Sequence, residues 1–131
     1  MNEHLKKYKY KEIWGRREDD FFIEVVRWNS EDILEGEISI WNIYCYIYPS
    51  HKLFNELTDE SIFGAEILNF PGRCAYCRFH RNTNGEIASK QYGNDYNPIW
   101  DEEIRKINNP EEAYEVFNDA EDLYNFLKGN N

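Results

Sequence analysis

Residues 37–48 constrain the fold most, because apolar side chains alternate along them with a period of two. One side of this segment would carry the apolar residues Trp41, Ile43, Cys45 and Ile47. The other side would carry Ile40 and Asn42 and a ladder of tyrosines, Tyr44, Tyr46 and Tyr48. Such alternation predicts a β-strand with one face in the core. The tyrosine face is expected either to cover the core or to meet a partner.

A β-hairpin is predicted over residues 74–92. Its strands would be residues 74–81 and 86–92, joined by the turn Asn82-Thr83-Asn84-Gly85. Asn84 and Gly85 tolerate the positive φ angles that tight hairpin turns require. Residues 21–28 are rich in β-branched and aromatic side chains, which predicts a further strand, paired with one around residues 9–14.

The C-terminal segment predicts an amphipathic helix. Asn109 is a suitable N-cap, Pro110 suits the first helical position, and the acids Glu111 and Glu112 would lie at the positive end of the helix dipole. An apolar stripe follows, with residues three and four apart: Ala113, Val116, Phe117, Ala120, Leu123, Tyr124 and Leu127. Lys128 and Gly129 would end the helix.

Two shorter helical segments are also expected, one after Ser30 and one near residues 58–61, because Ser and Thr are good N-cap residues. Together these elements predict a single α+β domain over residues 1–131. It would have an antiparallel sheet of four to six strands, with the C-terminal helix packed on one face.

The formal charge of −10, from 25 acidic and 15 basic residues, limits the choice of partner. It argues against direct binding to the phosphate backbone of nucleic acid, which requires Lys and Arg. It favours the basic surface of another protein, with a protein that itself binds nucleic acid as one candidate, and it leaves a homodimer open. Aromatic residues make up 17% of the chain, which raises the expectation of a recognition surface.

The sequence predicts a cytoplasmic protein. The N-terminal residues have no apolar stretch resembling a signal peptide, and no run is long enough to span a membrane. The chain has three cysteines, an odd number that does not suit a disulfide framework.

The segment after the hairpin holds a dense mixture of acids, amides and aromatic residues. Loops at strand ends often carry binding residues. Arginine can bind phosphate and aromatic rings can stack on a base. A pocket for a nucleotide-like ligand is therefore an alternative hypothesis, and its candidate residues are Tyr76, Arg78, Asp95, Tyr96 and Trp100. Asp101 is a further candidate binding residue in this cluster, because with Asp95 and Asn97 it could offer oxygen ligands to a divalent metal, although the spacing lacks the Gly and terminal Glu of an EF-hand loop.

Regularly spaced acids on the predicted C-terminal helix suggest a second way to bind. They are usually only a solvated face, but a row of carboxylates can also compete for a basic groove made for nucleic acid. The candidate residues for this contact are Glu111, Glu112, Glu115 and Asp119.

Two cysteines and a nearby histidine suggest metal binding as a further hypothesis. Cys74 and Cys77 have the spacing of a zinc ligand pair, and His80 lies three residues further on, but zinc normally takes four ligands. In a regular strand Cys74 and His80 would share one face while Cys77 faced the other. We therefore expect no resident metal or cofactor, with a zinc-binding protein as a third hypothesis. No pairing of a nucleophile with a base is evident, so no catalytic residue is expected.

Four short motifs resemble a family of small uncharacterised proteins from phages and prophages. They are Tyr48-Pro49-Ser50-His51, Gly72-Arg73-Cys74-Ala75-Tyr76-Cys77, Gly93-Asn94-Asp95-Tyr96-Asn97 and Asp119-Ala120-Glu121. Together with the aromatic strand before the first motif and the helix around the last, the resemblance covers residues 40–127, about two-thirds of the chain. This chain has Asn94 where the family pattern has Cys, and Pro98 where it has His. Because small acidic phage proteins often block host defence proteins, the resemblance implies an inhibitor.

Overall fold

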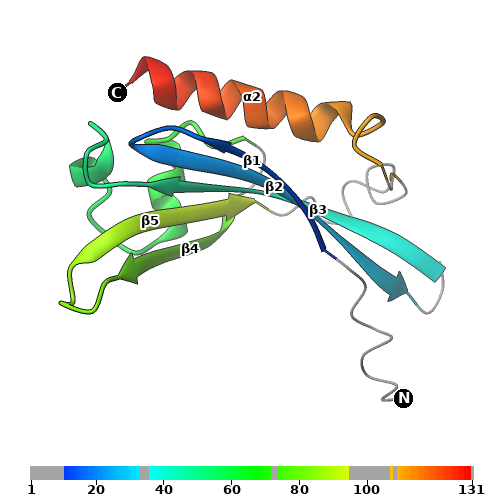
Figure 1. Ribbon diagram of the computed structural model, residues 1–131, viewed down its shortest axis with the longest axis horizontal. Coiled ribbons are helices and arrows are strands. Elements are labelled where there is room, and N and C mark those ends of the chain that lie inside the picture. The colour runs from blue at the N-terminus through cyan, green and yellow to red at the C-terminus, as the bar shows by residue number, and fades with distance from the viewer. Residues whose placement is uncertain (1–10, 33–35, 72–73, 95–106, 108, 131) are drawn as a thin grey trace.

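The computed structural model describes residues 11–32, 36–71, 74–94, 107 and 109–130. These residues form one antiparallel sheet of five strands with a helix across it, an α+β arrangement (Figure 1). The elements are strands β1 (Lys11–Arg17), β2 (Phe21–Asp32), β3 (Gly36–Ile47), β4 (Cys74–Arg81) and β5 (Ile87–Asn94), the short 3₁₀ helices η1 (Phe54–Glu56) and η2 (Ile62–Glu66), and helix α2 (Tyr114–Gly129). The predicted fold class is confirmed.

The strands follow the order β1-β2-β3-β5-β4 across the sheet. β1, β2 and β3 form a meander, and β5 pairs with only the last part of β3, residues 44–47. The predicted hairpin is confirmed as β4 and β5, with Gly85 at a φ of 82° in the turn. The strand predicted around residues 9–14 is found as β1, paired with β2.

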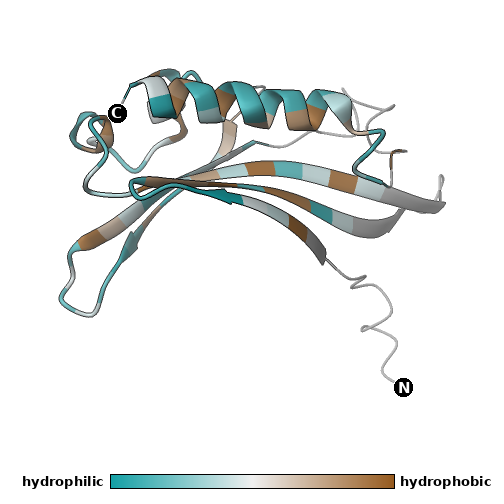
Figure 2. Ribbon diagram, turned by 45° about the horizontal axis from the view of Figure 1, so that its top comes forward, coloured by the Kyte–Doolittle hydropathy of each residue, from teal (hydrophilic) through white to brown (hydrophobic). Residues whose placement is uncertain are grey.

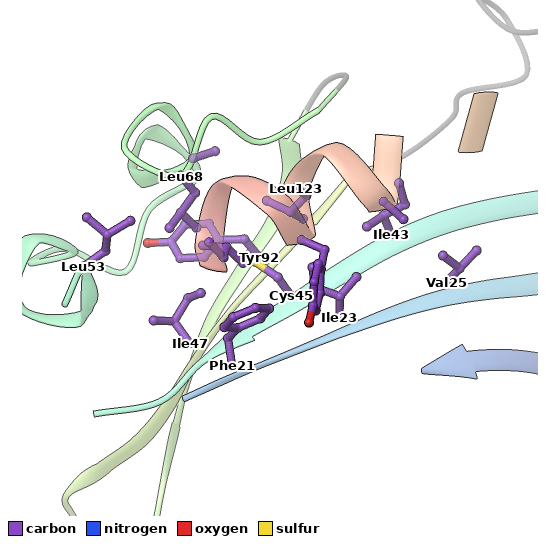
Figure 3. Packing of buried hydrophobic residues seen from close by; sticks show 14 of the residues in the cluster. Phe21, Ile23, Val25, Ile43, Cys45, Ile47, Leu53, Leu68, Tyr92 and Leu123 are labelled. Carbon is purple, nitrogen blue, oxygen red and sulfur yellow. The ribbon is translucent and has the colours of Figure 1, made fainter. Parts of the chain in front are cut away.

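The core lies between the sheet and α2, as Figure 3 shows. On β3 the predicted apolar side is buried completely: Trp41, Ile43, Cys45 and Ile47 are each 0% exposed. Phe21, Ile23 and Val25 from β2 and Tyr92 from β5 lie beside them. The opposite side of the same strands has no described helix over it (Figure 2). We call the two sides the covered face and the open face.

Helix α2 supplies the other half of the core. Five of its residues are buried, Val116, Ala120, Leu123, Tyr124 and Leu127, and Ala113 just before it is buried too. Side chains near the β1–β2 turn form polar contacts with the second half of α2. Arg16 forms an ion pair with Glu121, and Glu18 accepts hydrogen bonds from Tyr124 and from Lys128, the latter at 3.0 Å. The hydrogen bond from Tyr124 is the main cause that lowers the pKa of Glu18.

Two buried polar side chains join the irregular segment after β3 to the rest of the fold. The ring of His51 accepts a hydrogen bond at Nδ1 from the Leu53 amide (3.0 Å), and its Nε2 lies 2.9 Å from the Leu127 carbonyl in α2. Lys90 of β5 donates to the carbonyl oxygens of Phe54 (2.7 Å) and Leu57 (2.6 Å). Both side chains therefore act as structural ties.

Three local predictions need correction. Ser30 does not begin a helix, because β2 runs on to Asp32 and stays paired with β3 throughout. β2 and β3 are each twelve residues long, and the hydrogen bonds and side-chain contacts between them stabilise the strand more than one serine cap would stabilise a helix. Asn109 caps a turn, accepting from the Glu112 amide at 2.9 Å, and α2 begins only at Tyr114. By contrast, the short helix predicted to start near residues 58–61 is confirmed as η2, whose N-cap Ser61 accepts a hydrogen bond from the Phe63 amide.

The third correction concerns Cys74. A register shift between Cys74 and Tyr76 interrupts the alternation of β4. Cys74 therefore packs against the core together with Cys77, and does not share a face with His80. Such a bulge inserts a residue that simple alternation along a strand does not anticipate. Among the described residues, no helix is long and apolar enough to cross a membrane.

Candidate functional site

The open face carries one continuous row of side chains across all five strands. Each member is registered with the next, from β1 through β2, β3 and β5 to β4: Arg17, Phe22, Tyr46, Gln91 and Arg78. The adjacent row contains Gly15, Glu24, Tyr44, Gly93 and Tyr76. Polar and aromatic side chains from distant parts of the sequence are thereby brought onto one surface.

Two glycines let aromatic rings of the open face approach the neighbouring strand closely. A Cβ atom on Gly93 would come within 2.5 Å of the ring of Tyr44. A Cβ atom on Gly15 would come within 2.8 Å of the ring of Phe22. An edge of each ring therefore comes closer to the neighbouring strand than a residue with a Cβ atom would allow, and such close approach is a usual reason for glycine inside a strand.

A chain of hydrogen bonds fixes the polar groups of this face. The Tyr46 hydroxyl donates to Glu24 Oε1 at 3.1 Å and accepts from Gln91 Nε2 at 2.9 Å. The Oε1 atom of Gln91 lies 2.6 Å from Nε2 of His80, which places the proton on that imidazole nitrogen. Burial raises the pKa of Tyr46, with a further contribution from the Glu24 carboxylate. Tyr46 therefore remains a neutral donor at physiological pH.

The rings form two groups around this chain. Tyr46 lies between Phe22 and His80, with ring centroids 5.8 Å and 6.0 Å away. Tyr76 stands edge-on to Tyr44 at 6.0 Å, with the ring planes at 88°. Tyr76 is 38% exposed, and the other rings are partly buried. The open face thus offers an aromatic surface whose groups are held in place by one another.

The cations of the open face lie at its two ends. Arg17 stacks over Phe22, with its guanidinium carbon 4.8 Å from the ring centroid, and its Nη1 is 3.4 Å from the Tyr48 hydroxyl. Arg78 is exposed, and no hydrogen bond or ion pair joins it to another described residue. Glu24 is the acid within these two rows, and it is engaged by Tyr46.

A second surface lies on the opposite side of the molecule, along the outer side of α2 and the turn before it. We call it the acidic helix surface, and its residues are Glu111, Glu112, Tyr114, Glu115, Asp119 and Asp122. Glu111, Glu112 and Glu115 are exposed and have no basic partner among the described residues. Tyr114 is 70% exposed in their midst.

The structure separates the residues that the sequence singled out. Tyr76 and Arg78 lie together on the open face, whereas Glu111, Glu112, Glu115 and Asp119 belong to the acidic helix surface. Asp95, Tyr96, Trp100 and Asp101 lie outside the described residues. The open face was only partly anticipated: Arg17, Phe22, Glu24 and Gln91 were not proposed as site residues. Isolated glycines within strand patterns, Gly15 and Gly93, were the available signal for it.

The cysteines do not form a metal centre within the described part of the chain. Cys77, Tyr92 and Cys45 lie side by side on the covered face, in register across β4, β5 and β3. Burial is the main cause that raises the pKa of each of the three thiols, Cys45, Cys74 and Cys77. Raised thiol pKa values oppose formation of the thiolate that binds metal or reacts.

Two of the hollows lined by described residues lie away from Tyr76 and Arg78. One, of about 200 Å³, lies between α2 and strands β1 and β2, and is lined chiefly by Trp14, Phe117 and Tyr124. The other, of about 420 Å³, lies at η2 and includes Phe63 and Cys74.

Comparisons of the chain with protein-family models, with curated proteins and with solved structures found no match.

Proposed function

We propose that the protein is a non-enzymatic binding protein of phage or prophage type that antagonises a host defence protein. It acts in the cytoplasm of the host cell and occupies a basic surface of its target. A protein that itself binds nucleic acid is the partner whose surface charge fits best, because its groove is already built to receive regularly spaced negative charges.

The observation that carries this proposal is the arrangement of the acidic helix surface. Glu111, Glu112 and Glu115 point to solvent without a basic partner among the described residues, and Tyr114 is 70% exposed between them. A large exposed tyrosine is typical of the residues that dominate binding energy in protein interfaces. The carboxylates around it would speed association with a basic partner and fix its orientation.

The acids also have a structural role that any experiment must separate from binding. Carboxylates at the start of a helix stabilise it through the helix dipole, by about 0.3–1 kcal/mol each. Reversing their charge will therefore weaken α2 slightly even if they contact nothing. Circular dichroism of each variant is needed to show that the fold is retained.

The test is charge reversal on the acidic helix surface, with Glu111, Glu112, Glu115 and Asp119 all changed to Lys. The matched control reverses four exposed acids elsewhere: Glu56, Asp59, Glu66 and Glu86. Both variants change the net charge by the same amount. Wild type and both variants are immobilised, and the host proteins that each one retains are quantified by mass spectrometry.

We expect the wild type and the control to retain the same basic host protein, and the α2 variant to lose it. The interaction is then repeated with the purified target, and Tyr114→Ala is expected to weaken it by roughly tenfold or more, as for a hot-spot residue. Equal retention by all three forms would rule out the acidic helix surface as the binding site.

A further inference from the structure

We propose that the hollow between α2 and strands β1 and β2 binds a small, neutral aromatic molecule with one N–H group, about the size of indole (Figure 1). No residue of the acidic helix surface lines this hollow, and Tyr76 and Arg78, two candidates for a nucleotide-like ligand, lie elsewhere. It is therefore a separate site, and a ligand can bind there whether or not the protein also binds a host protein.

The walls of the hollow are mainly apolar. Three of the lining residues are aromatic and three are aliphatic: Trp14, Phe117 and Tyr124, and Ile23, Val25 and Ala120. Ile23 and Val25 are each 3% exposed, so this part of the wall belongs to the buried core. A concave site lined mainly by apolar and aromatic side chains is the usual form of a small-molecule pocket.

The volume of the hollow, about 200 Å³, is large enough for a small aromatic ring system. For comparison, an apolar cavity of about 150 Å³ stays dry and binds benzene. Packed protein interiors leave few voids larger than a water molecule, so a hollow of this size beside the core is unusual. Water gains few hydrogen bonds from apolar walls, and an aromatic ring that replaces it removes apolar surface from water.

The space is a local feature of one side of α2 and does not reflect loose packing of the whole helix. Elsewhere on α2, Leu123 and Leu127 are 1% and 0% exposed. At the hollow, the helix presents Ala120, whose side chain is a single methyl group. From β1, Gly15 also lines the hollow, and a Cβ atom on Gly15 would meet the ring of Phe22. These two small residues leave the space open.

The aromatic walls are already ordered by contacts with other side chains. Trp14 stacks on Trp41 with ring centroids 5.6 Å apart, and Phe117 stands edge-on to Trp14 at 5.7 Å. Tyr124 is held by its hydrogen bond to Glu18. Ordered walls lose little side-chain entropy when a ligand binds, which favours affinity. Because aromatic rings also gain from edge-to-face and offset contacts, these walls favour a flat aromatic ligand over an aliphatic one of equal volume.

The charged residues of the lining, Arg16 and Glu121, mark the side of the hollow that faces solvent. They form an ion pair, and their side chains are 51% and 52% exposed. The guanidinium carbon of Arg16 lies 3.5 Å from the ring centroid of Tyr124, so that face of the ring is covered and the ligand must lie beside it. The two charges offset each other, which favours a neutral ligand. The Glu121 carboxylate can still accept a hydrogen bond from one N–H group of the ligand.

The experiment is isothermal titration calorimetry of the full chain with indole, followed by NMR spectroscopy of the same complex. We expect a single site with a dissociation constant below about 1 mM. The chemical-shift changes should centre on Trp14, Phe117 and Ala120. Indole-3-acetate and tryptamine carry the same ring system with a negative and a positive charge, and neither should bind more tightly than indole. Tighter binding of either one would overturn the preference for a neutral ligand.

Ala120→Leu should weaken indole binding roughly tenfold or more, because the larger side chain takes up space in the hollow. Ala88→Leu makes the same change at an exposed position of β5 and should leave the affinity unchanged. Circular dichroism shows whether both variants are folded.

The proposal fails if indole does not bind at millimolar concentration, or if a folded Ala120→Leu variant binds it as tightly as the wild type does. It also fails if the chemical-shift changes centre on the hollow at η2, which includes Phe63 and Cys74, or on any other part of the protein. The NMR result on the wild type decides between these outcomes even if Ala120→Leu does not fold.

Discussion

The covered face and the open face are built from alternate residues of the same strands, yet they are stabilised differently. On β3, Ile43 and Cys45 are completely buried beneath α2, while Tyr44 and Tyr46, their neighbours in sequence, are only partly buried. The covered face gains its stability from apolar area removed from water. The open face gains it from hydrogen bonds between side chains and from rings that approach glycines closely.

This difference shows what a surface needs in order to stay partly wet and still be rigid. Tyrosine provides a large ring for packing and a hydroxyl that can bond to protein or to water. Each hydroxyl bond contributes modestly, but the chain from Glu24 to His80 holds four side chains in one arrangement. The open face is therefore ordered without being sealed, a combination that suits recognition.

Removing Trp41 should produce the largest effect, because Trp41 is the largest fully buried side chain of the covered face. Trp41 is 0% exposed, stacks on Trp14 with centroids 5.6 Å apart, and donates from Nε1 to the Ile107 carbonyl at 2.9 Å. Trp41→Ala is expected to lower the free energy of unfolding by about 3–5 kcal/mol. Urea denaturation measures this, with Trp28→Ala, at a ring that is 37% exposed, as the milder comparison.

Gly93→Ala should have the next largest effect, and it tests the open face. Because the new methyl group would lie 2.5 Å from the ring of Tyr44, the ring must move, at a cost of about 1–3 kcal/mol. The same substitution in a Tyr44→Ala background should be much milder. Gly129→Ala is the control, since nothing lies within 4 Å of that position. An equal loss in both backgrounds would show that the ring contact is not the reason for the glycine.

Tyr46→Phe should have a smaller effect, because it deletes one hydroxyl and keeps the ring. Glu24 and Gln91 each lose a partner. Glu24 is only partly buried, so water can replace the hydroxyl there, and Gln91, which is 7% exposed, keeps its contact with His80. The expected loss is about 1 kcal/mol in the free energy of unfolding. Tyr48→Phe should have almost no effect, because its hydroxyl is 3.4 Å from Arg17 and takes no part in the chain. Similar losses from the two substitutions would argue that the chain contributes little.

Lys90→Met should have the smallest effect at neutral pH, since two changes oppose each other. The substitution removes a buried charge but leaves the carbonyl oxygens of Phe54 and Leu57 without their donor. Burial lowers the pKa of Lys90 in the folded protein below the 10.5 of the unfolded chain. Between those two values the unfolded state binds more protons, so folding stability rises with pH.

Wild type should therefore gain stability relative to Lys90→Met as the pH is raised from 7 toward 10.5. Chemical denaturation of both proteins across this range measures the difference. A difference that stays constant with pH would mean that Lys90 titrates alike in the folded and unfolded states.

Much of the fold could be predicted because the strands and the helix carry clear periodic patterns. Alternation on residues 37–48 identified the buried side of β3, and the three-and-four spacing after Ala113 identified the buried side of α2. Asn84 and Gly85 identified the hairpin turn. In each case the local sequence pattern and the packing of the whole fold favour the same structure.

The failures arose where tertiary contacts overrode a local preference. Ser30 is a good helix cap, but β2 and β3 pair across it. The bulge after Cys74 reverses the facing of that residue and has no clear signature in the sequence. Likewise, Arg17 and Arg78 lie far apart in sequence, and only the register of all five strands places them in one row.

The contacts that hold α2 also bear on the order in which the chain folds. The meander of β1, β2 and β3 joins segments close in sequence, whereas the contacts of Glu121 with Arg16 and of Tyr124 with Glu18 span 105 and 106 residues. Contacts of such long range carry a large loop-closure entropy and generally form late. Substitutions at these contacts should then accelerate unfolding and leave the refolding rate almost unchanged. The lifetime of the native state, more than the rate at which it forms, would therefore depend on the contacts that hold α2 against the sheet.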